Sequence, residues 1–300
     1  MTTDTLTAEP FLSGLFFGEC PRWHQGRLWY SDFFDHAVYS VSPDGERRVE
    51  VAFEGEPAGL GWLPDGRLLV ASRLDRVIMR REHDGTMVRH GDLQPWATWW
   101  ANDMVVASNG QLYAGNFGFD LDALYEGTLD GSQIKPTSLI RVDPDGTTHQ
   151  AAADIAFPNG TVITEDGKTL VIAESLGGRL TAFDRERDGS LTNRREWASL
   201  PGVAPDGICL CEDNTIWVSN ALGHECVRVA EGGEVLERVT TSMNCFACML
   251  GDDDRRTLYM ITAVESHGAK ARSERLPRSQ RRQRGRRRGR PMRRLSGVTR

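Results

Sequence analysis

The sequence predicts an all-β protein, a six-bladed β-propeller with four-stranded blades around a central channel. Three observations favour this fold. The 300 residues include 31 Gly and 13 Pro, a composition typical of many short strands joined by turns. One unit, a strand, a tight turn and a second strand that begins with an apolar pair, occurs six times. Successive turns lie 40 to 57 residues apart, and a period of about 40–50 residues is typical of propeller blades.

The predicted strands follow the same order in each unit. A tight turn and the strand after it are expected at 25–33, 64–72, 108–116, 165–175, 212–220 and 254–263. Further hairpins are expected between these units at 37–52, 138–153 and 179–198. The longest interval contains residues 116–136, which we interpret as an inserted loop that could overhang one end of the channel.

Oxygen-bearing side chains occupy matching positions in four of the six units. Counting back seven or eight residues from the turn reaches Glu19, Asn102, Asn159 and Asp206. The same count reaches Ala58 and Ala247 in the other two units. The first strand of a blade lies against the central axis, so these positions should converge at one mouth of the channel. "FPNG" at 157–160 and "APDG" at 204–207 are therefore predicted to begin innermost strands and not to form turns.

Two carboxylates and two amides form a set of hard oxygen ligands. Such a set suits Ca²⁺, Mg²⁺ or Mn²⁺ and suits a structural zinc site poorly. The alternative is that Asn and Asp before Gly merely begin strands. The sequence contains no G-x-S-x-G, no phosphate-binding G-x-x-x-x-G-K-[ST] and no H-E-x-x-H motif. A divalent cation site is the chemistry that the repeat predicts.

The cysteines and the N-terminal segment predict a soluble cytoplasmic protein. The apolar segment near residue 15 lacks a basic flank, and no apolar run reaches membrane-spanning length. We therefore expect the six cysteines to be reduced, with "CLC" at 209–211 and "CFAC" at 245–248 as buried thiols and not metal ligands. Trp99 and Trp100 precede Asn102, where they either line a pocket or pack in the core.

The net charge of −6 conceals two oppositely charged parts. Residues 270–300 carry fourteen Lys and Arg against one acidic residue, whereas residues 1–269 carry 22 basic against 41 acidic residues. An acidic domain suits divalent cations and not nucleic acid. Nucleic acid is an expected partner only if the basic tail is genuine, and neither a membrane partner nor a particular oligomeric state is indicated.

The tail also affects the predicted fold. We divide the chain into a propeller domain at 1–263 and a basic, disordered tail at 264–300. The alternating pattern ends after Ala263, so the sixth blade is expected to be incomplete, with the segment "FLSGLFFGE" adding an outer strand. Arg, Gly, Pro and Ser dominate the tail, as in an out-of-frame translation of GC-rich codons. The alternative is a native basic arm.

Four motifs together resemble those of the senescence marker protein/regucalcin/gluconolactonase family. They are "GECPRWHQGRLWYSDF" (18–33), "WANDM" (100–104), "FPNGTVITEDGKTLVIAES" (157–175) and "APDGICLCEDNTIWVSN" (204–220). The resemblance covers about residues 12–263. It implies a six-bladed propeller that holds one divalent metal ion, Ca, Mn, Mg or Zn, and that hydrolyses sugar lactones or related esters. It further implies that Glu19, Asn159 and Asp206 bind the metal and that Asn102 lies beside metal and substrate; it assigns no role to Asp103.

The sequence departs from that family at one position. Sugar-lactone hydrolases often have Arg two residues before the Asn of the third motif, and this chain has Trp100. An aromatic face replaces a bidentate donor, so the substrate is expected to carry fewer hydroxyl groups than an aldonolactone. The hypothesis is that the metal polarises the lactone carbonyl, Asp206 acts as general base and Asn102 positions the carbonyl oxygen. Alternatives are a calcium- or ligand-binding propeller without turnover and an interaction scaffold that uses the tail.

Overall fold

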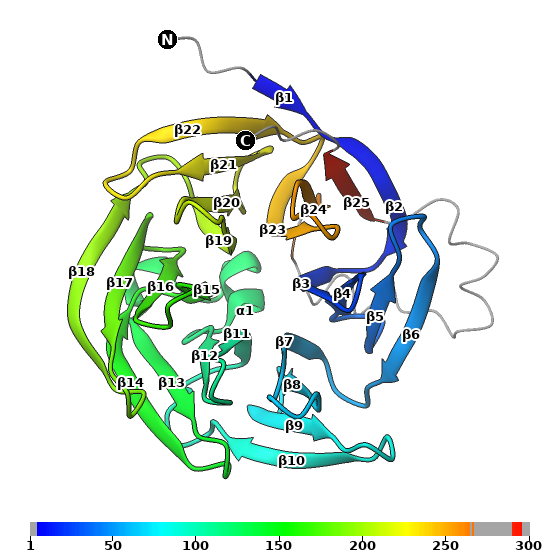
Figure 1. The fold of residues 1–300 in the computed structure, drawn as a ribbon. Helices are drawn as coiled ribbons and strands as arrows, with labels where there is room; N and C mark the ends of the chain where they lie inside the picture. Colours follow the sequence, from blue (N-terminus) through cyan, green and yellow to red (C-terminus); the bar gives the residue numbers. More distant parts are fainter. Residues whose placement is uncertain (1–4, 265, 267–289, 296–300) are drawn as a thin grey trace.

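The computed structural model describes residues 5–264, 266 and 290–295. Within these residues the strands form six sheets arranged in a ring around a central axis (Figure 1). The only regular helices in the described residues are α1 (Leu121–Tyr125) and the 3₁₀ helix η1 (Gly131–Gln133). Neither is long or apolar enough to cross a membrane. The prediction of an all-β propeller is confirmed.

The first three sheets in chain order are antiparallel meanders of four strands. One contains β3 (Gly18–His24), β4 (Arg27–Asp32), β5 (Ala37–Val41) and β6 (Arg47–Ala52). The next contains β7 (Pro57–Trp62), β8 (Leu68–Ser72), β9 (Val77–Arg81) and β10 (Met87–Asp92). The third contains β11 (Ala101–Val106), β12 (Leu112–Asn116), β13 (Thr137–Val142) and β14 (Thr148–Ile155).

The other three sheets repeat this order, and the chain termini join two of them. One contains β15 (Pro158–Ile163), β16 (Thr169–Glu174), β17 (Arg179–Arg185) and β18 (Leu191–Ser199). The next contains β19 (Pro205–Leu210), β20 (Ile216–Asn220), β21 (Glu225–Val229), β22 (Val235–Thr240) and the parallel outer strand β1 (Thr5–Thr7). The last contains β23 (Asn244–Gly251), β24 (Thr257–Ala263), β25 (Arg290–Leu295) and β2 (Glu9–Leu15).

The innermost strands form the ring. Each of β3, β7, β11, β15, β19 and β23 contacts the innermost strand of the next sheet, and β23 contacts β3 (Figure 1). "FPNG" and "APDG" begin β15 and β19, as predicted from the repeat. The tight turn lies instead at residues 165–167, where Gly167 donates its N–H to Thr164 O at 2.8 Å.

Every innermost strand is interrupted at the same place by an irregularity in its pairing. The register with the neighbouring strand shifts between Glu19 and Arg22, Pro57 and Leu60, Ala101 and Met104, Pro158 and Thr161, Pro205 and Ile208, and Cys245 and Ala247. A bulge bends a strand and redirects its side chains. The six irregularities therefore fix the direction of the side chains that converge at this end of the ring, which we call the site end.

Glycines allow the innermost strands to approach one another. A Cβ atom on Gly160 would lie 2.4 Å from Ile208 N and 2.6 Å from Asp206 O, both in the neighbouring strand β19. A Cβ on Gly207 would lie 2.7 Å from Ala247 Cα in β23. Because backbone atoms cannot rotate away as a flexible side chain can, these positions exclude any larger residue without movement of a strand.

Gly160→Ala is therefore expected to lower the free energy of unfolding by about 1–3 kcal/mol, the usual cost of inserting a methyl group into a closely packed interior. Denaturant unfolding followed by fluorescence measures the change. Gly131→Ala is the matched control, because its Cβ would meet only the Leu124 side chain at 3.6 Å. Equal stability of the two variants would contradict this account of the ring.

The second and third strands of a sheet are covered on both faces by the two neighbouring sheets, and they carry apolar side chains on both faces. In β16, Leu170 and Ile172 pack against side chains of β12 and β13, whereas Val171 and Ala173 pack against β20. A strand that is covered on both sides reads as a continuous apolar run. This packing explains the apolar pairs that follow each turn in the sequence.

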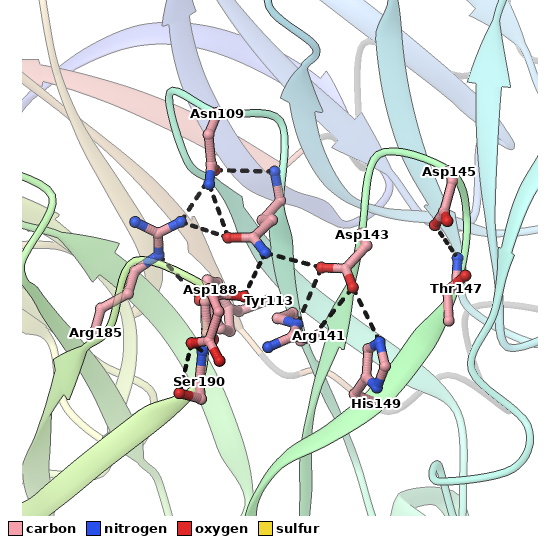
Figure 2. A network of polar contacts seen from close by, with 12 residues as sticks. Asn109, Tyr113, Arg141, Asp143, Asp145, Thr147, His149, Arg185, Asp188 and Ser190 are labelled. Atoms are coloured by element: carbon pink, nitrogen blue, oxygen red, sulfur yellow. Dashed lines mark hydrogen bonds and ion pairs between the residues drawn. The ribbon is translucent and has the colours of Figure 1, made fainter.

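A polar network joins two neighbouring sheets at the end of the ring opposite the site end (Figure 2). Gln111 donates through Nε2 to Asp143 Oδ1 at 2.9 Å and to Asp188 O at 2.8 Å, and Tyr113 donates to Gly189 O at 2.6 Å. Arg185 donates to Gln111 Oε1 at 2.7 Å. These bonds connect the hairpin turns of the two sheets and hold them at a fixed distance.

The last sheet differs from the prediction. β2 adds an outer strand, as expected for the "FLSGLFFGE" segment, but the sheet has four strands, so the expected incompleteness is not confirmed. Residues 290–295 of the tail form β25 between β24 and β2, where disorder was predicted. Without β25 the edge of β24 would offer unpaired backbone groups, and pairing with them requires no alternating apolar pattern. The remainder of the tail, residues 265, 267–289 and 296–300, lies outside the described residues.

The insertion between β12 and β13 carries α1, which projects over the middle of the ring in Figure 1. Asp120 caps the helix by accepting from Ala123 N. Tyr125 O–H lies 2.8 Å from Ser266 Oγ, after β24. The loop thus reaches from its own sheet to the last one across the site end, which agrees with the predicted overhang.

Candidate metal and active site

The four predicted site residues begin four different innermost strands. Glu19 lies in β3, Asn102 in β11, Asn159 in β15 and Asp206 in β19, and each is only 5–8% exposed. Each lies at or beside the pairing irregularity of its strand. Polar groups buried at the same level of adjacent strands require partners or a bound ion.

The structure brings three of these residues into electrostatic contact. Burial raises the pKa of the Asp206 carboxyl well above its usual range, and the nearby Glu19 carboxylate, Cys245 thiol and Asp103 carboxylate raise it further. A hydrogen bond from the Asn159 side chain acts in the opposite direction on the same pKa. Like charges held together out of water are the environment in which a divalent cation is most strongly favoured.

Hydrogen bonds orient both amides. Asn159 Nδ2 donates to Ser175 Oγ at 3.1 Å, and that hydroxyl donates to Pro205 O at 2.7 Å. Asn102 Nδ2 donates to Pro158 O at 3.2 Å, next to Asn159. In both residues the amide nitrogen faces a backbone or hydroxyl acceptor, which leaves the amide oxygen as the atom able to bind a cation.

The donor set fits a hard divalent cation. Glu19 and Asp206 supply carboxylate oxygens and Asn159 supplies an amide oxygen, the ligand types that Ca²⁺, Mg²⁺ and Mn²⁺ prefer. Among the described residues, no group of three or more His, Cys, Asp and Glu side chains could hold a metal ion. A metal at this position would consequently depend on the amide in addition to the two carboxylates.

The sequence did not reveal two partners of the site. Asp103, adjacent to Asn102, pairs with Arg22 at 2.6 Å, with the two side chains 8% and 18% exposed. Arg22 also donates to Met104 O. This ion pair places one positive charge beside three acidic groups. Arg22 follows Glu19 in the first motif, but only the folded chain shows that it faces Asp103 of another sheet.

The cysteines agree with their prediction. All six lie in the described part of the chain and none forms a disulfide. Cys245 and Cys248 are buried in β23, Cys209 is buried in β19 and Cys211 is half-buried. Burial raises the pKa of the Cys209 thiol to about 12. Thiols of this kind are protonated at neutral pH and are poor metal ligands.

Ser175→Ala is expected to weaken binding of Ca²⁺ or Tb³⁺ by about 10- to 100-fold, because the hydroxyl that orients Asn159 is lost and residues that orient a ligand typically have effects of this size. Isothermal titration calorimetry or terbium luminescence measures the change. Ser219→Ala is the matched control, since Ser219 Oγ is buried and has no hydrogen-bond partner among the described residues. An unchanged affinity in Ser175→Ala would show that the Ser175 hydroxyl does not orient Asn159 for metal binding.

A family model, described as the SMP-30/Gluconolactonase/LRE-like region, matches residues 17–264. The chain belongs to this family. The resemblance indicated by the four sequence motifs is thereby confirmed, and the matched segment contains every candidate site residue.

Relatives and solved structures of this family cover most of the chain. Lactonase drp35 from Staphylococcus aureus strain MW2 is 26% identical over 232 residues, 72% of this chain and 68% of the relative. Regucalcin from Xenopus laevis is 23% identical over 258 residues, 83% of each chain. A gluconolactonase structure from Xanthomonas campestris is 25% identical with a TM-score of 0.68, covering 87% of this chain and 85% of that one.

A second solved structure matches this chain over most of its length. It is a calcium-binding protein, regucalcin, from Agrobacterium tumefaciens, with a TM-score of 0.75. The match covers 99% of this chain and 96% of that one, at 18% identity. Similarity at this identity shows the fold alone.

Trp100 lies beside the candidate site in this member of the SMP-30/gluconolactonase/LRE-like family. It precedes β11, two residues before Asn102, and is half-buried. Its ring lies 6.2 Å from Phe117, and the Arg73 guanidinium carbon lies 4.1 Å from its ring centroid. Sequence reasoning left open whether Trp100 lines a pocket or packs in the core, and the structure gives it one packed face and one accessible part.

Proposed function

We propose that the protein is a metal-dependent hydrolase of a lactone, a sugar lactone or a related cyclic ester. The observation that carries the proposal is the convergence of Glu19, Asn159 and Asp206, from three separate sheets, in a chain whose relatives include a lactonase and a gluconolactonase. We retain six blades, one for each sheet, with the site on their common axis. We also retain the cytoplasm as the location of the protein.

In this proposal Glu19, Asn159 and Asp206 would hold one divalent metal ion. When bound, such an ion would polarise the lactone carbonyl and favour an incoming water. Asp206 would accept the proton of that water at its carboxylate. Asn102, held by its bond to Pro158, would position the carbonyl oxygen through the second N–H of its amide.

A lactone panel tests the proposal. Hydrolysis releases one carboxylic acid proton per turnover, so a pH indicator reports the rate with Mn²⁺, Ca²⁺, Mg²⁺, Zn²⁺ or chelator. We expect turnover that requires a metal and that ceases in chelator. The absence of turnover on every lactone with all four metals would reject the hydrolase proposal.

A second candidate is a calcium-binding propeller without turnover. The regucalcin from Xenopus laevis matches 83% of this chain, and the Agrobacterium structure is described as a calcium-binding protein. A ring of oxygens can serve stability or regulation alone. Calorimetric binding of Ca²⁺ together with no turnover on the lactone panel would favour this candidate.

A further inference from the structure

The layer of residues just outside the candidate ligands is built from cross-strand pairs. We call the position that Glu19, Asn102, Asn159 and Asp206 occupy in their innermost strands the ligand level. In five sheets, the residue two positions before this level accepts a backbone hydrogen bond from the residue that follows the second strand of the same sheet. The donor and acceptor residues of these bonds are Phe33 and Phe17, Arg73 and Glu56, Phe117 and Trp100, Ser175 and Phe157, and Ala221 and Ala204. We call these five pairs the outer layer.

Aromatic rings dominate the outer layer. Phe17 and Phe33 lie 5.5 Å apart, Trp100 and Phe117 6.2 Å apart, and Phe117 and Phe157 5.1 Å apart, measured between ring centroids. Phe17 precedes Glu19, Trp100 precedes Asn102 and Phe157 precedes Asn159 by two residues. An aromatic residue therefore precedes three of the four predicted site residues and lies nearer the site end of the ring than they do.

Phe157 adopts a backbone conformation that disfavours it. Its φ is +62°, in the left-handed region where residues other than Gly are uncommon. Residues held in such conformations concentrate at functional sites, because the surrounding structure must compensate for them. Phe157 and Trp100 are also the members of the aromatic set that remain half-buried.

The one charged pair of the outer layer is neutralised internally. Arg73 is 3% exposed and pairs with Glu56, whose side chain is 1% exposed. Its guanidinium carbon lies over the rings of Trp100 at 4.1 Å and Phe117 at 4.8 Å. Phe33 also packs on this guanidinium, at 5.2 Å, and a guanidinium buried against a carboxylate and three rings is not directed at the hydroxyl groups of a substrate.

Exposed apolar side chains lie outside the outer layer, at the surface of the site end. Five of the six large hydrophobic residues that are exposed in the described part of the chain lie in the connections at the site end: Leu74, Tyr125, Leu176, Leu222 and Val264. Each connection starts beside an innermost strand, as shown by the pairing of Ser72 with Pro57 and of Glu174 with Pro158. These side chains therefore lie on the face of the ring from which a ligand would reach the candidate site.

We propose that the site takes lactones whose ring carries an apolar alkyl or aryl substituent and not the hydroxyl groups of a sugar lactone. This inference rests on the proposed lactone hydrolysis. The ester group contacts the polar ligand level, and the substituent lies against Trp100, Phe157 and the apolar connections. The one cationic side chain of the outer layer, Arg73, is only 3% exposed, so a hydroxylated substituent gains no accessible charged donor there and loses its hydrogen bonds with water.

Three six-membered lactones with the same reacting ring test the inference. δ-Decalactone carries an alkyl chain, δ-valerolactone carries no substituent and glucono-δ-lactone carries hydroxyl groups. We expect kcat/KM to fall in that order, by about tenfold at each step, which is the usual discrimination of an apolar site. Glucono-δ-lactone turned over as fast as δ-decalactone would overturn the inference.

Substitutions of exposed residues keep the test independent of folding. The double variant Leu176→Ser and Leu222→Ser is expected to lower kcat/KM for δ-decalactone by about tenfold and to change kcat/KM for δ-valerolactone far less. Val49→Ser, at an exposed residue of β6 away from the site end, is the matched control. Equal effects of the double variant on both lactones, or an equal effect of Val49→Ser, would count against the apolar connections.

A binding measurement separates this inference from the proposed function. If no lactone is hydrolysed, the hydrolase proposal fails, and tryptophan fluorescence with two unreactive lactams then decides the present inference. Binding of 6-pentyl-2-piperidinone at least tenfold tighter than that of 2-piperidinone supports the apolar layer. Equal binding of the two lactams, or no binding of either, overturns it.

Discussion

Asp206→Ala is expected to reduce kcat for lactone hydrolysis by about 10²- to 10⁴-fold, the contribution typical of a general base. The carboxylate is 8% exposed, and burial together with Glu19, Cys245 and Asp103 raises its pKa. The proposal assigns this carboxylate two roles, as a ligand of the metal and as the acceptor of the water proton. The rate is measured by proton release at saturating metal and lactone.

Asp206→Asn separates the two roles. An amide retains an oxygen ligand but cannot act as a base, so turnover should be lost while terbium binding persists with reduced affinity. Asp44→Ala is the matched control, because Asp44 occupies the same Pro-Asp-Gly sequence in an exposed turn. An Asp206→Ala protein that binds metal and keeps the wild-type kcat would reject Asp206 as the base.

Glu56→Ala is expected to lower the free energy of unfolding by about 3–5 kcal/mol, the cost of leaving a buried charge uncompensated. Glu56 and Arg73 are 1% and 3% exposed at their side chains, and Arg73 packs on Phe33, Trp100 and Phe117. Without the carboxylate, the guanidinium must either remain buried alone or move out and disrupt these rings. Urea unfolding measures the loss.

Glu46→Ala serves as the comparison for this second prediction. Glu46 pairs with Arg48, and both side chains are more than half exposed. Exposed ion pairs contribute about 0–1 kcal/mol, so this variant should unfold nearly as the wild type does. A double variant Glu56→Ala and Arg73→Met should recover most of the lost stability, and failure to recover it would show that the charge is not the cause.

The repeat allowed most of the fold to be predicted. Turns such as the one at residues 165–167 recur 40 to 57 residues apart, because each repeat of the sequence forms one sheet of the ring. Counting back a fixed number of residues from those turns located Asn159 and Asp206 at the start of β15 and β19, although the sequences "FPNG" and "APDG" resemble turns. Local turn chemistry alone would have placed both residues at the surface.

Contacts between sheets were not predictable from the repeat. The pairing of Arg22 with Asp103 and the bond from Asn102 to Pro158 join residues 81 and 56 positions apart. They depend on the irregularity in each innermost strand, which leaves no pattern in the letters. β25 was missed for a related reason, since its pairing depends on an available edge and not on its own composition.

The closeness of the innermost strands has a consequence for how such a protein can diversify. Because a Cβ atom added to Gly160 or Gly207 would lie within 3 Å of backbone atoms of the next strand, neither can acquire a side chain without displacing Asp206 or Ala247. Substitution of these glycines is thereby disfavoured at the level of the candidate ligands. New specificities must instead arise two residues earlier and in the connections at the rim, where substitutions such as Arg to Trp leave the central geometry untouched.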